Sequence, residues 1–211
     1  MSRPVDPLTQ YCEALSTPPS PLLQALERET HLKTLAPQMM SGHLQGQLLQ
    51  LLCHLKQPKQ ALEIGTFTGY AALCMAAGLP EDGILHTIEA NPELEYLIRK
   101  YIDQADLQEK ISLHIGKAEE IIPEIEGNFD LVFLDAGKLD YPLFYDLVID
   151  RLNSGGLIIA DNVLWSGKVV QGLRDKDTQA LHAFNQMIQD DSRVRNLILP
   201  IRDGLLIAQK K

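Results

Sequence analysis

The sequence predicts an α/β fold: a central, mostly parallel sheet of seven strands that includes an antiparallel C-terminal hairpin strand, with helices on both faces. Three observations carry this prediction. From residue 60 onward, short apolar runs alternate with helical segments, which is typical of parallel strands covered on both sides. Several of these runs end in Glu, Asp or Asn, at the edge where such sheets bind ligands. The last two runs are joined by a short polar turn, which favours a hairpin.

Length and composition indicate one domain. A chain of 211 residues with 45% hydrophobic and 22% charged residues has an ordinary globular composition and can bury a sizeable core. We expect a single domain over 1–211, in which N-terminal helices within 1–57 cover a site that an α/β core in 58–211 provides. The apolar runs are too short to span a bilayer and the first residues show no signal peptide, so a cytoplasmic protein is expected.

Two helices are expected before the first strand. Ser20 and Pro21 are the residue types of an N-cap and a first helical position, and this helix should run to about Leu35, before Pro37. A second helix is expected over about His43–Leu55. Its leucines recur at helical spacing and should form one buried face: Leu44, Leu48, Leu51, Leu52 and Leu55.

Strands and helices then alternate along the chain. The expected parallel strands are Gln60–Ile64, Ile84–Glu89, Ile111–Ile115, Leu131–Asp135 and Leu157–Asp161. The expected helices lie near 69–79, 92–105, 117–124 and 140–152, with a last one over about Asp177–Gln189. The hairpin strands are Val194–Leu199 and Leu205–Gln209, joined by Arg202-Asp203-Gly204, so one edge strand should run antiparallel.

The first strand leads into a glycine turn that has the form of a ligand-binding loop. Gly65 and Gly69 follow the strand and precede a helix, so the backbone there can approach a ligand closely. The G-x-x-x-G spacing differs from the G-x-G-x-x-G of dinucleotide-binding proteins, and the sequence contains no G-x-x-x-x-G-K-[ST] phosphate loop. Taken alone, the turn is a weak signal, because some turns of this kind only connect two elements.

Two acidic residues sharpen the interpretation of this turn. Glu89 ends the next strand, roughly 20 residues after the glycines, where a carboxylate can bind ribose hydroxyl groups. The alternative is a solvated carboxylate at a strand end. Glu63 lies inside an apolar strand, and a buried carboxylate is costly unless it is paired. We therefore expect Glu63 to hold the loop or the amino group of a ligand.

Two further strand ends carry oxygen ligands. Asp135, Asp161 and Asn162 should lie at the same edge of the sheet and bring two carboxylates and one amide together. Such donors suit a hard divalent cation, Mg²⁺, Ca²⁺ or Mn²⁺. On spacing alone, helix capping or surface solvation explains these residues equally well.

A set of motifs points to a family. In order, the chain contains G-Q-L-L at 46–49, E-I-G-T-F-T-G-Y at 63–70, Glu89, F-L-D-A-G-K at 133–138, G-G-L-I-I-A-D-N-V-L-W-S-G-K-V at 155–169 and R-D-G-L-L at 202–206. From about Met39 to the C-terminus, the chain resembles the cation-dependent O-methyltransferases of the catechol and caffeoyl-CoA type. The resemblance implies a Rossmann-like class I methyltransferase fold, which five parallel strands plus a terminal hairpin match better than a dehydrogenase-type sheet.

The resemblance also implies a site. Asp135, Asp161 and Asn162 match the metal ligands, with Mg²⁺ the expected cation, and Lys138 matches the lysine that deprotonates the substrate; an ordinary solvated lysine is the alternative. Two vicinal hydroxyls of the substrate would chelate the metal before attack on the sulfonium methyl in line. Gly137 departs from the plant-like D-A-D-K pattern, so plant substrate preferences do not transfer directly. S-adenosylmethionine should lie along Met39, Ser41, Glu63, Gly65, Phe67, Tyr70, Glu89, Ala118 and Asp135.

Two aromatic residues are candidates for the acceptor site. Trp165 follows the metal pair by three residues, and its ring should either form a wall for an aromatic substrate or pack in the core. The same two roles apply to Tyr141, with packing favoured. The expected acceptor is a small aromatic molecule with vicinal hydroxyls, either catechol-like or caffeoyl-type.

Charge and motifs weigh against other functions. The net charge of −9 weighs against nucleic acid as a partner, which makes a tRNA hydroxyuridine O-methyltransferase the second candidate. A nicotinamide-dependent reductase would lack its glycine fingerprint, and a non-catalytic binding module would have little use for Lys138 beside metal ligands. The resemblance implies a homodimer formed through the N-terminal helices, and no membrane partner is expected.

Overall fold

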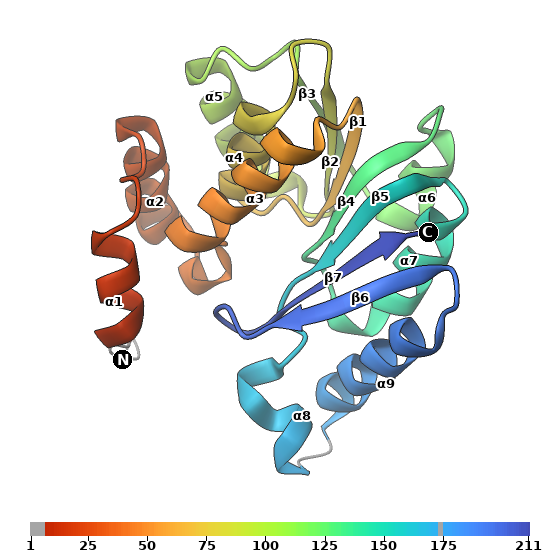
Figure 1. Cartoon of the computed structure of the whole chain (residues 1–211). Coiled ribbons are helices and arrows are strands. Elements are labelled where there is room, and N and C mark those ends of the chain that lie inside the picture. Colours follow the sequence, from red (N-terminus) through yellow and green to blue (C-terminus); the bar gives the residue numbers. More distant parts are fainter. Residues whose placement is uncertain (1–6, 173–174) are drawn as a thin grey trace.

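The computed structural model describes residues 7–172 and 175–211, and every structural statement below refers to these residues. Seven strands form one sheet in the order β3-β2-β1-β4-β5-β7-β6 (Figure 1). The strands are β1 (Gln60–Ile64), β2 (Ile84–Glu89), β3 (Ile111–Ile115), β4 (Phe129–Leu134), β5 (Leu152–Ala160), β6 (Val194–Leu199) and β7 (Leu205–Lys210).

Helices lie on both sides of the sheet (Figure 1). They are α1 (Pro7–Ala14), α2 (Pro21–Lys33), α3 (His43–Lys56), α4 (Tyr70–Gly78), α5 (Glu95–Gln104), α6 (Ala118–Ile121), α7 (Tyr141–Ile149), α8 (Lys168–Gln171) and α9 (Lys176–Asp190). Short 3₁₀ turns occupy Pro37–Met39, Pro92–Leu94, Ile122–Glu124, Lys138–Asp140 and Trp165–Gly167. Across the described residues, no helix has both the length and the apolar character that crossing a membrane requires.

Each face of the sheet has its own apolar core. On one face, Leu131 and Phe133 of β4 pack with buried residues of α2, α3, α4 and α5. On the other, Val132 and Leu134 of the same strand pack with α6, α7 and α9. Successive side chains of a strand point to opposite faces, so a strand that is buried on both sides is apolar at every position. The predicted α/β class, with helices on both faces, is confirmed.

The hairpin enters the sheet in a different way from the one expected. Strands β1 to β5 are parallel, and β7 is antiparallel to both of its neighbours, β5 and β6. The predicted antiparallel hairpin strand is confirmed and is β7. The edge strand β6 runs parallel to the first five, so the prediction that the antiparallel strand lies at the edge is wrong. Leu205, Leu206 and Ala208 of β7 are fully buried, whereas Leu197 of β6 is 51% exposed. The more apolar strand of the hairpin takes the inner position.

Two strands begin earlier than expected. β4 starts at Phe129, which pairs with Leu152 of β5, and the register shifts before Leu131 pairs with Leu157. The Asn-Ser-Gly-Gly sequence after Leu152 is typical of a turn, yet the chain remains in the sheet there, with Gly155 at a φ of 75°. Both strands end as expected for the site, because Asp135 and Asp161 directly follow them.

The N-terminal helices confirm one expectation and correct another. The hydroxyl of Ser20 accepts a hydrogen bond from the Leu23 N–H at 3.3 Å, so Ser20 caps α2 as predicted. The predicted buried face of α3 is wrong, because Leu51 and Leu55 are 52% and 70% exposed. The residues of α3 that are buried instead are Gln45, Gly46, Leu49 and Cys53.

A glycine explains which face of α3 is buried. A Cβ built on Gly46 would lie 2.7 Å from the sulfur of Cys74 and 2.9 Å from the ring of Tyr70, both on α4. Only glycine allows α3 to approach α4 this closely. The helices therefore meet on the side of Gly46, and Leu51 and Leu55 turn outward. Neither α1 nor α8 was expected from the sequence.

Candidate active site

Four neighbouring strands bring the predicted functional residues to one edge of the sheet. Glu63 lies in β1, Glu89 ends β2, Asp135 follows β4 and Asp161 follows β5. These strands are adjacent in the order β2-β1-β4-β5, and all are parallel, so their carboxyl ends face the same way. This is the edge at which open α/β sheets bind ligands.

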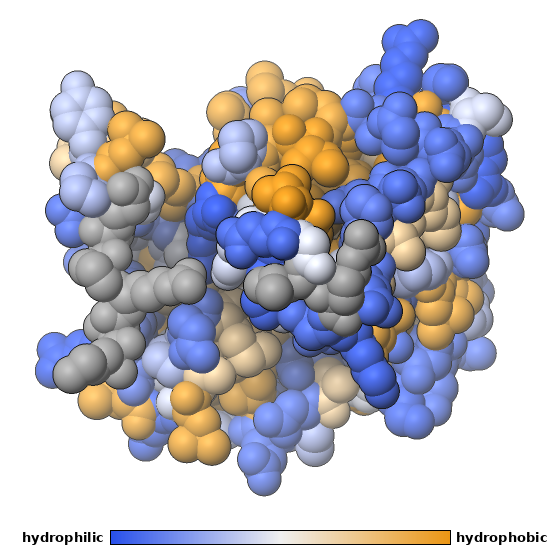
Figure 2. Space-filling model, turned by 90° about the horizontal axis from the view of Figure 1, so that it is seen from below, coloured by the Kyte–Doolittle hydropathy of each residue, from blue (hydrophilic) through white to orange (hydrophobic). Residues whose placement is uncertain are grey.

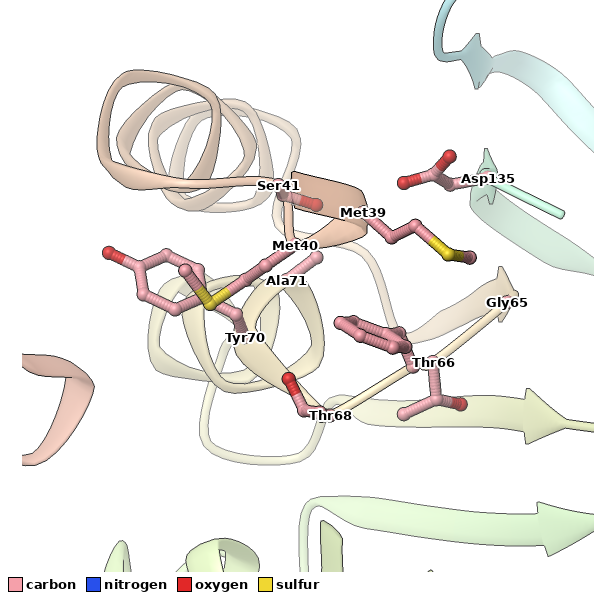
Figure 3. A pocket seen from close by; sticks show the side chains of 10 residues that line it. Met39, Met40, Ser41, Gly65, Thr66, Thr68, Tyr70, Ala71 and Asp135 are labelled. Carbon is pink, nitrogen blue, oxygen red and sulfur yellow. The ribbon is translucent and has the colours of Figure 1, made fainter. Parts of the chain in front are cut away.

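A pocket lies beside the glycine turn. Figure 3 shows that its lining comes from the segment before α3, from the turn after β1 with the start of α4, and from the end of β4. Six of the nine residues expected to bind the cofactor line it: Met39, Ser41, Gly65, Phe67, Tyr70 and Asp135. The other lining residues are Met40, Thr66, Thr68 and Ala71.

The glycine turn owes its shape to a contact within the protein. Gly65 has a φ of 98°, and a Cβ there would lie 2.2 Å from the carbonyl oxygen of Asp135. Gly65 is therefore required by the close approach of the β1 and β4 ends, in addition to any approach to a ligand. Phe67 also has a positive φ, of 53°, which is uncommon for a bulky residue and marks this turn as strained.

Glu89 fastens the same turn. Its carboxylate accepts a hydrogen bond from the Phe67 N–H at 2.7 Å and another from the Asn91 N–H at 2.8 Å. The side chain is 8% exposed, and burial raises its pKa above the ordinary value. Each oxygen retains a lone pair for a ligand. Ala118, the remaining predicted cofactor residue outside β1, is the buried first residue of α6, just after β3.

Glu63 has an incomplete set of partners. The Thr87 hydroxyl donates to its Oε2, but among the described residues its buried Oε1 has no hydrogen-bond partner. Burial raises the pKa of Glu63 to about 8, even though the Thr87 hydrogen bond favours the charged form. An orphaned carboxylate oxygen on the strand that leads into the pocket fits a ligand with a positively charged amino group.

Two carboxylates come close together at the ends of β4 and β5. Burial raises the pKa of Asp135 to about 6; the nearby ammonium of Lys138 opposes this rise and the negative charge of Asp161 adds to it. Asp161 is 2% exposed, and its Oδ1 accepts the Asn162 N–H at 2.6 Å. Asn162 adopts a left-handed φ of 60° directly after the strand. Paired, largely buried carboxylates beside an amide suit a hard cation.

The possible metal ligands at this edge include the side-chain oxygen of Asn162. No group of three or more His, Cys, Asp or Glu side chains within the described ranges is placed to hold a metal ion. A cation at this edge would therefore use the oxygen of Asn162, or oxygens of a substrate and water, beside Asp135 and Asp161.

Lys138 is held close to these carboxylates. Its side chain is only 11% exposed, and its Nζ lies 3.1 Å from Oδ1 of Asp135 and 2.8 Å from the hydroxyl of Tyr141. The alternative of an ordinary solvated lysine does not fit this burial. A lysine held beside these two carboxylates could exchange a proton with a substrate bound there.

The two aromatic candidates differ in exposure. Tyr141 is fully buried, and its ring meets that of Phe184 edge to face at 5.3 Å, so the favoured packing role fits, and a contact with substrate stays a prediction. Trp165 is partly buried against the same core, with the Nζ of Lys168 5.9 Å from the centre of its ring. A role for Trp165 in acceptor binding stays a prediction.

Gln45 and Arg202 were not predicted as site residues. Gln45 is fully buried in α3, and its amide nitrogen donates to Oδ2 of Asp161 at 2.8 Å. Arg202 donates to the Gln45 oxygen at 3.3 Å and to the carbonyl of Met40 at 3.1 Å. These bonds fix the orientation of the amide and tie the pocket segment to the carboxylate. Gln45 was not predicted because nothing in the sequence around it marks it as a site residue.

The hairpin turn closes the other side of the site. The N–H of Val163 donates to the Gly204 carbonyl at 3.1 Å, and the N–H of Leu164 donates to the Asp203 carbonyl at 2.9 Å. The carboxylate of Asp203 also accepts the Ser166 N–H, and its pKa is raised by burial. The loop that carries Trp165 is thereby tied to the turn between β6 and β7.

Comparison with known proteins gives the family. The family model described as O-methyltransferase matches residues 13–211. The chain is 36% identical over 211 residues to catechol O-methyltransferase domain-containing protein 1 of Mus musculus, covering 97% of this chain and 80% of that protein. It is also 36% identical over 174 residues to a catechol O-methyltransferase of Niastella koreensis, covering 78% and 79% of the two chains.

A solved structure agrees with these relatives. The O-methyltransferase TomG from Streptomyces achromogenes, which is involved in tomaymycin synthesis and was crystallised in complex with S-adenosylmethionine, superimposes with a TM-score of 0.89 at 28% identity. The match covers 97% of this chain and 96% of that one. The fold, the site edge and the relatives agree, and the chain therefore belongs to the O-methyltransferase family, a class I S-adenosylmethionine-dependent family.

Proposed function

We propose that this chain methylates one hydroxyl of a small aromatic molecule with two adjacent hydroxyl groups, using S-adenosylmethionine and a divalent cation. One observation carries the proposal. Asp135 lines the glycine-turn pocket, binds Lys138 at 3.1 Å and lies close to Asp161. Asp135 therefore belongs to the proposed methyl-donor pocket, is a proposed cation ligand and contacts the proposed base.

In this proposal, S-adenosylmethionine occupies the pocket and supplies an electrophilic methyl group. Glu89 accepts hydrogen bonds from the ribose hydroxyls with the lone pairs that Phe67 and Asn91 leave free. The orphaned Oε1 of Glu63 balances the positive amino group of the ligand. The remaining contacts come from Met39, Ser41, Gly65, Phe67, Tyr70, Ala118 and Asp135.

Asp135, Asp161 and Asn162 would hold the cation, for which Mg²⁺ is proposed. A bound divalent cation supplies Lewis acidity, which lowers the pKa of a neighbouring hydroxyl. Lys138 receives the hydroxyl proton at its Nζ. The main contribution of the chain is to hold the acceptor oxygen in line with the methyl donor.

The acceptor class rests on relatives and on one local feature. Both relatives above carry catechol O-methyltransferase in their names, which supports an acceptor with vicinal hydroxyls. Next to Lys138, this chain has Gly137 where the plant-like motif has an aspartate, so that carboxylate is absent. A Cβ at this position would lie 2.8 Å from Oδ2 of Asp140, so a carboxylate from another residue stands close to that place. Trp165 is the candidate wall for the aromatic ring.

The test is methyl transfer to catechol, caffeic acid, caffeoyl-CoA and hydroxylated tRNA, with and without chelator. We expect transfer to a catechol-type acceptor that is abolished by chelation and restored by Mg²⁺. Lys138→Ala should lower turnover by about 100-fold or more while the affinity for S-adenosylhomocysteine stays unchanged. Full activity in excess chelator would exclude the cation, and transfer to tRNA alone would replace the acceptor class.

The proposal includes a homodimer. Helix α1 has no buried residue, and Leu8, Tyr11 and Leu15 on or next to it are 65% to 71% exposed. Leu51 and Leu55 of α3 are exposed as well. In the view from below, apolar side chains face solvent on the side where α1 and α2 lie (Figure 2). A second copy that covers these helices would bury surface that a monomer leaves in water.

A further inference from the structure

Tyr141 contacts Lys138 from the side of the protein core. This tyrosine is the first residue of α7 and is fully buried, and its hydroxyl accepts a hydrogen bond from Lys138 Nζ at 2.8 Å. The same hydroxyl lies 3.0 Å from the carbonyl oxygen of Leu134 and 2.9 Å from that of Asp161. We propose that Tyr141 is a positioning residue that aims the nitrogen of Lys138 at the acceptor hydroxyl. The inference rests on the proposed role of Lys138 as base.

The hydroxyl of Tyr141 can act toward Lys138 in only one direction. A phenol has one O–H donor and two acceptor lone pairs. The two carbonyls can only accept, so the proton of Tyr141 points at them and a lone pair remains for an N–H of Lys138. Tyr141 is thereby a fixed acceptor toward Lys138.

The two carbonyls also link the base to the cation ligands. One belongs to Leu134, the residue immediately before Asp135, and the other belongs to Asp161 itself. The backbone that places the two carboxylates therefore also places the tyrosine hydroxyl. The ring is held separately by Phe184, edge to face at 5.3 Å, so the hydroxyl has little freedom to move.

These contacts determine where the Lys138 nitrogen can meet a substrate. A lysine nitrogen has three positions at which it can form a hydrogen bond. Asp135 Oδ1 at 3.1 Å and the Tyr141 hydroxyl at 2.8 Å take two of them. The third position is then left for the acceptor hydroxyl. Since a lysine side chain has four rotatable bonds, removing one of the two contacts would release this orientation.

The test compares two tyrosines that share a packing partner. Tyr141→Phe keeps the ring against Phe184 and removes only the hydroxyl. Tyr145→Phe is the matched control, because Tyr145 is 1% exposed, meets the same Phe184 at 6.4 Å and loses a hydrogen bond to Asp191 of 2.8 Å. We expect Tyr141→Phe to lower kcat about 10-fold or more, with KM for the acceptor within about twofold of wild type. Tyr145→Phe should keep the wild-type kcat.

Binding and stability separate positioning from a structural defect. By calorimetry, the affinity of Tyr141→Phe for S-adenosylhomocysteine should equal that of wild type, and its Tm should fall no further than that of Tyr145→Phe. Loss of this affinity, or a much larger fall in Tm than in the control, would assign Tyr141 a structural role and overturn the proposal. A wild-type kcat in Tyr141→Phe would overturn it too.

A double-mutant cycle distinguishes this inference from the proposed function. If Tyr141 acts only through Lys138, Tyr141→Phe should change kcat by less than about twofold in a Lys138→Ala background. An additive loss in that background contradicts the inference while leaving Lys138 as the base. A Lys138→Ala protein with wild-type turnover instead removes the base assignment itself.

Discussion

At the scale of single residues, Glu63 stands out because the described part of the chain leaves one of its buried carboxylate oxygens without a hydrogen-bond partner. Burial raises its pKa to about 8, against 4.5 for an ordinary glutamate. The folded chain therefore holds this proton more tightly than the unfolded chain, and the free energy of unfolding falls as the pH rises from 4.5 to 8. Glu63→Gln removes this titration. In the absence of cofactor, it should raise Tm by a few degrees at pH 8, roughly 2–4 °C per kcal/mol, and have little effect near pH 4.5.

The same substitution should weaken the cofactor site. If Oε1 of Glu63 balances a ligand amino group, the neutral amide of Glu63→Gln should lower the affinity for S-adenosylhomocysteine about 10-fold, as measured by calorimetry. Glu126→Gln, at an exposed glutamate before β4, is the control and should change neither quantity. A more stable protein with unchanged affinity would show that Glu63 serves the fold alone.

Gln45 makes a separate prediction at the same scale. Its amide donates to Asp161, a proposed cation ligand, and such supporting partners commonly change metal affinity 10–100-fold. Gln45→Leu should therefore lower the affinity for Mg²⁺ about 10-fold, measured by titration of activity and by calorimetry. Gln104→Leu, at an exposed position on α5, should leave it unchanged. A Gln45→Leu protein with wild-type Mg²⁺ affinity would contradict the coupling between α3 and the end of β5.

At the scale of elements, the contact between the ends of β1 and β4 can be tested with two glycines. Gly65 and Gly172 both have a positive φ, but a Cβ on Gly65 would lie 2.2 Å from the Asp135 carbonyl oxygen, whereas one on Gly172 would meet no atom of the described residues within 4 Å. Gly172→Ala should lower the free energy of unfolding by about 1–2 kcal/mol, which is the cost of the left-handed backbone conformation for a residue with a Cβ. Gly65→Ala adds a backbone clash and should cost more than about 3 kcal/mol, measured by chemical denaturation. Equal costs would show that the strand ends can move apart freely.

The strands and helices also show which parts of the fold the sequence pattern predicts. The bounds of β1, β2, β3 and β6 are predicted by short runs rich in apolar residues, and in the inner strands β1 and β2 burial on both faces requires such runs. The early start of β5 escapes this pattern, since glycines typical of a turn stay in the sheet through a register shift. The buried face of α3 escapes it as well. Periodicity locates the leucines, but the position of Gly46 decides which side meets α4.

Some site residues can likewise be predicted from the sequence and others cannot. Asp135, Asp161, Glu63 and Glu89 are recognisable because charged residues at the ends of apolar strands have few structural explanations. The contacts of Gln45 and Tyr141 join residues that are far apart in the chain. The spacing of residues along the sequence therefore does not reveal them.

At the scale of the whole molecule, the exposed leucines of α3 predict an assembly. Leu51→Glu together with Leu55→Glu would place charges on the surface proposed to meet a second copy, and should convert a dimer into a monomer in light scattering. Leu143→Glu is the control, because Leu143 is 46% exposed on α7, on the opposite face of the sheet. A wild-type protein that is monomeric at all concentrations would contradict the homodimer.

The bonds between Gln45, Arg202, Met40 and Asp161 join both halves of the chain at one carboxylate. Arg202 belongs to the turn between β6 and β7, so this corner of the site depends on the hairpin as well as on α3 and β5. A change in the position of this turn would remove the guanidinium that fixes Gln45. The disturbance would reach the carboxylate of Asp161 through the Gln45 amide, although Arg202 itself is not hydrogen-bonded to that carboxylate.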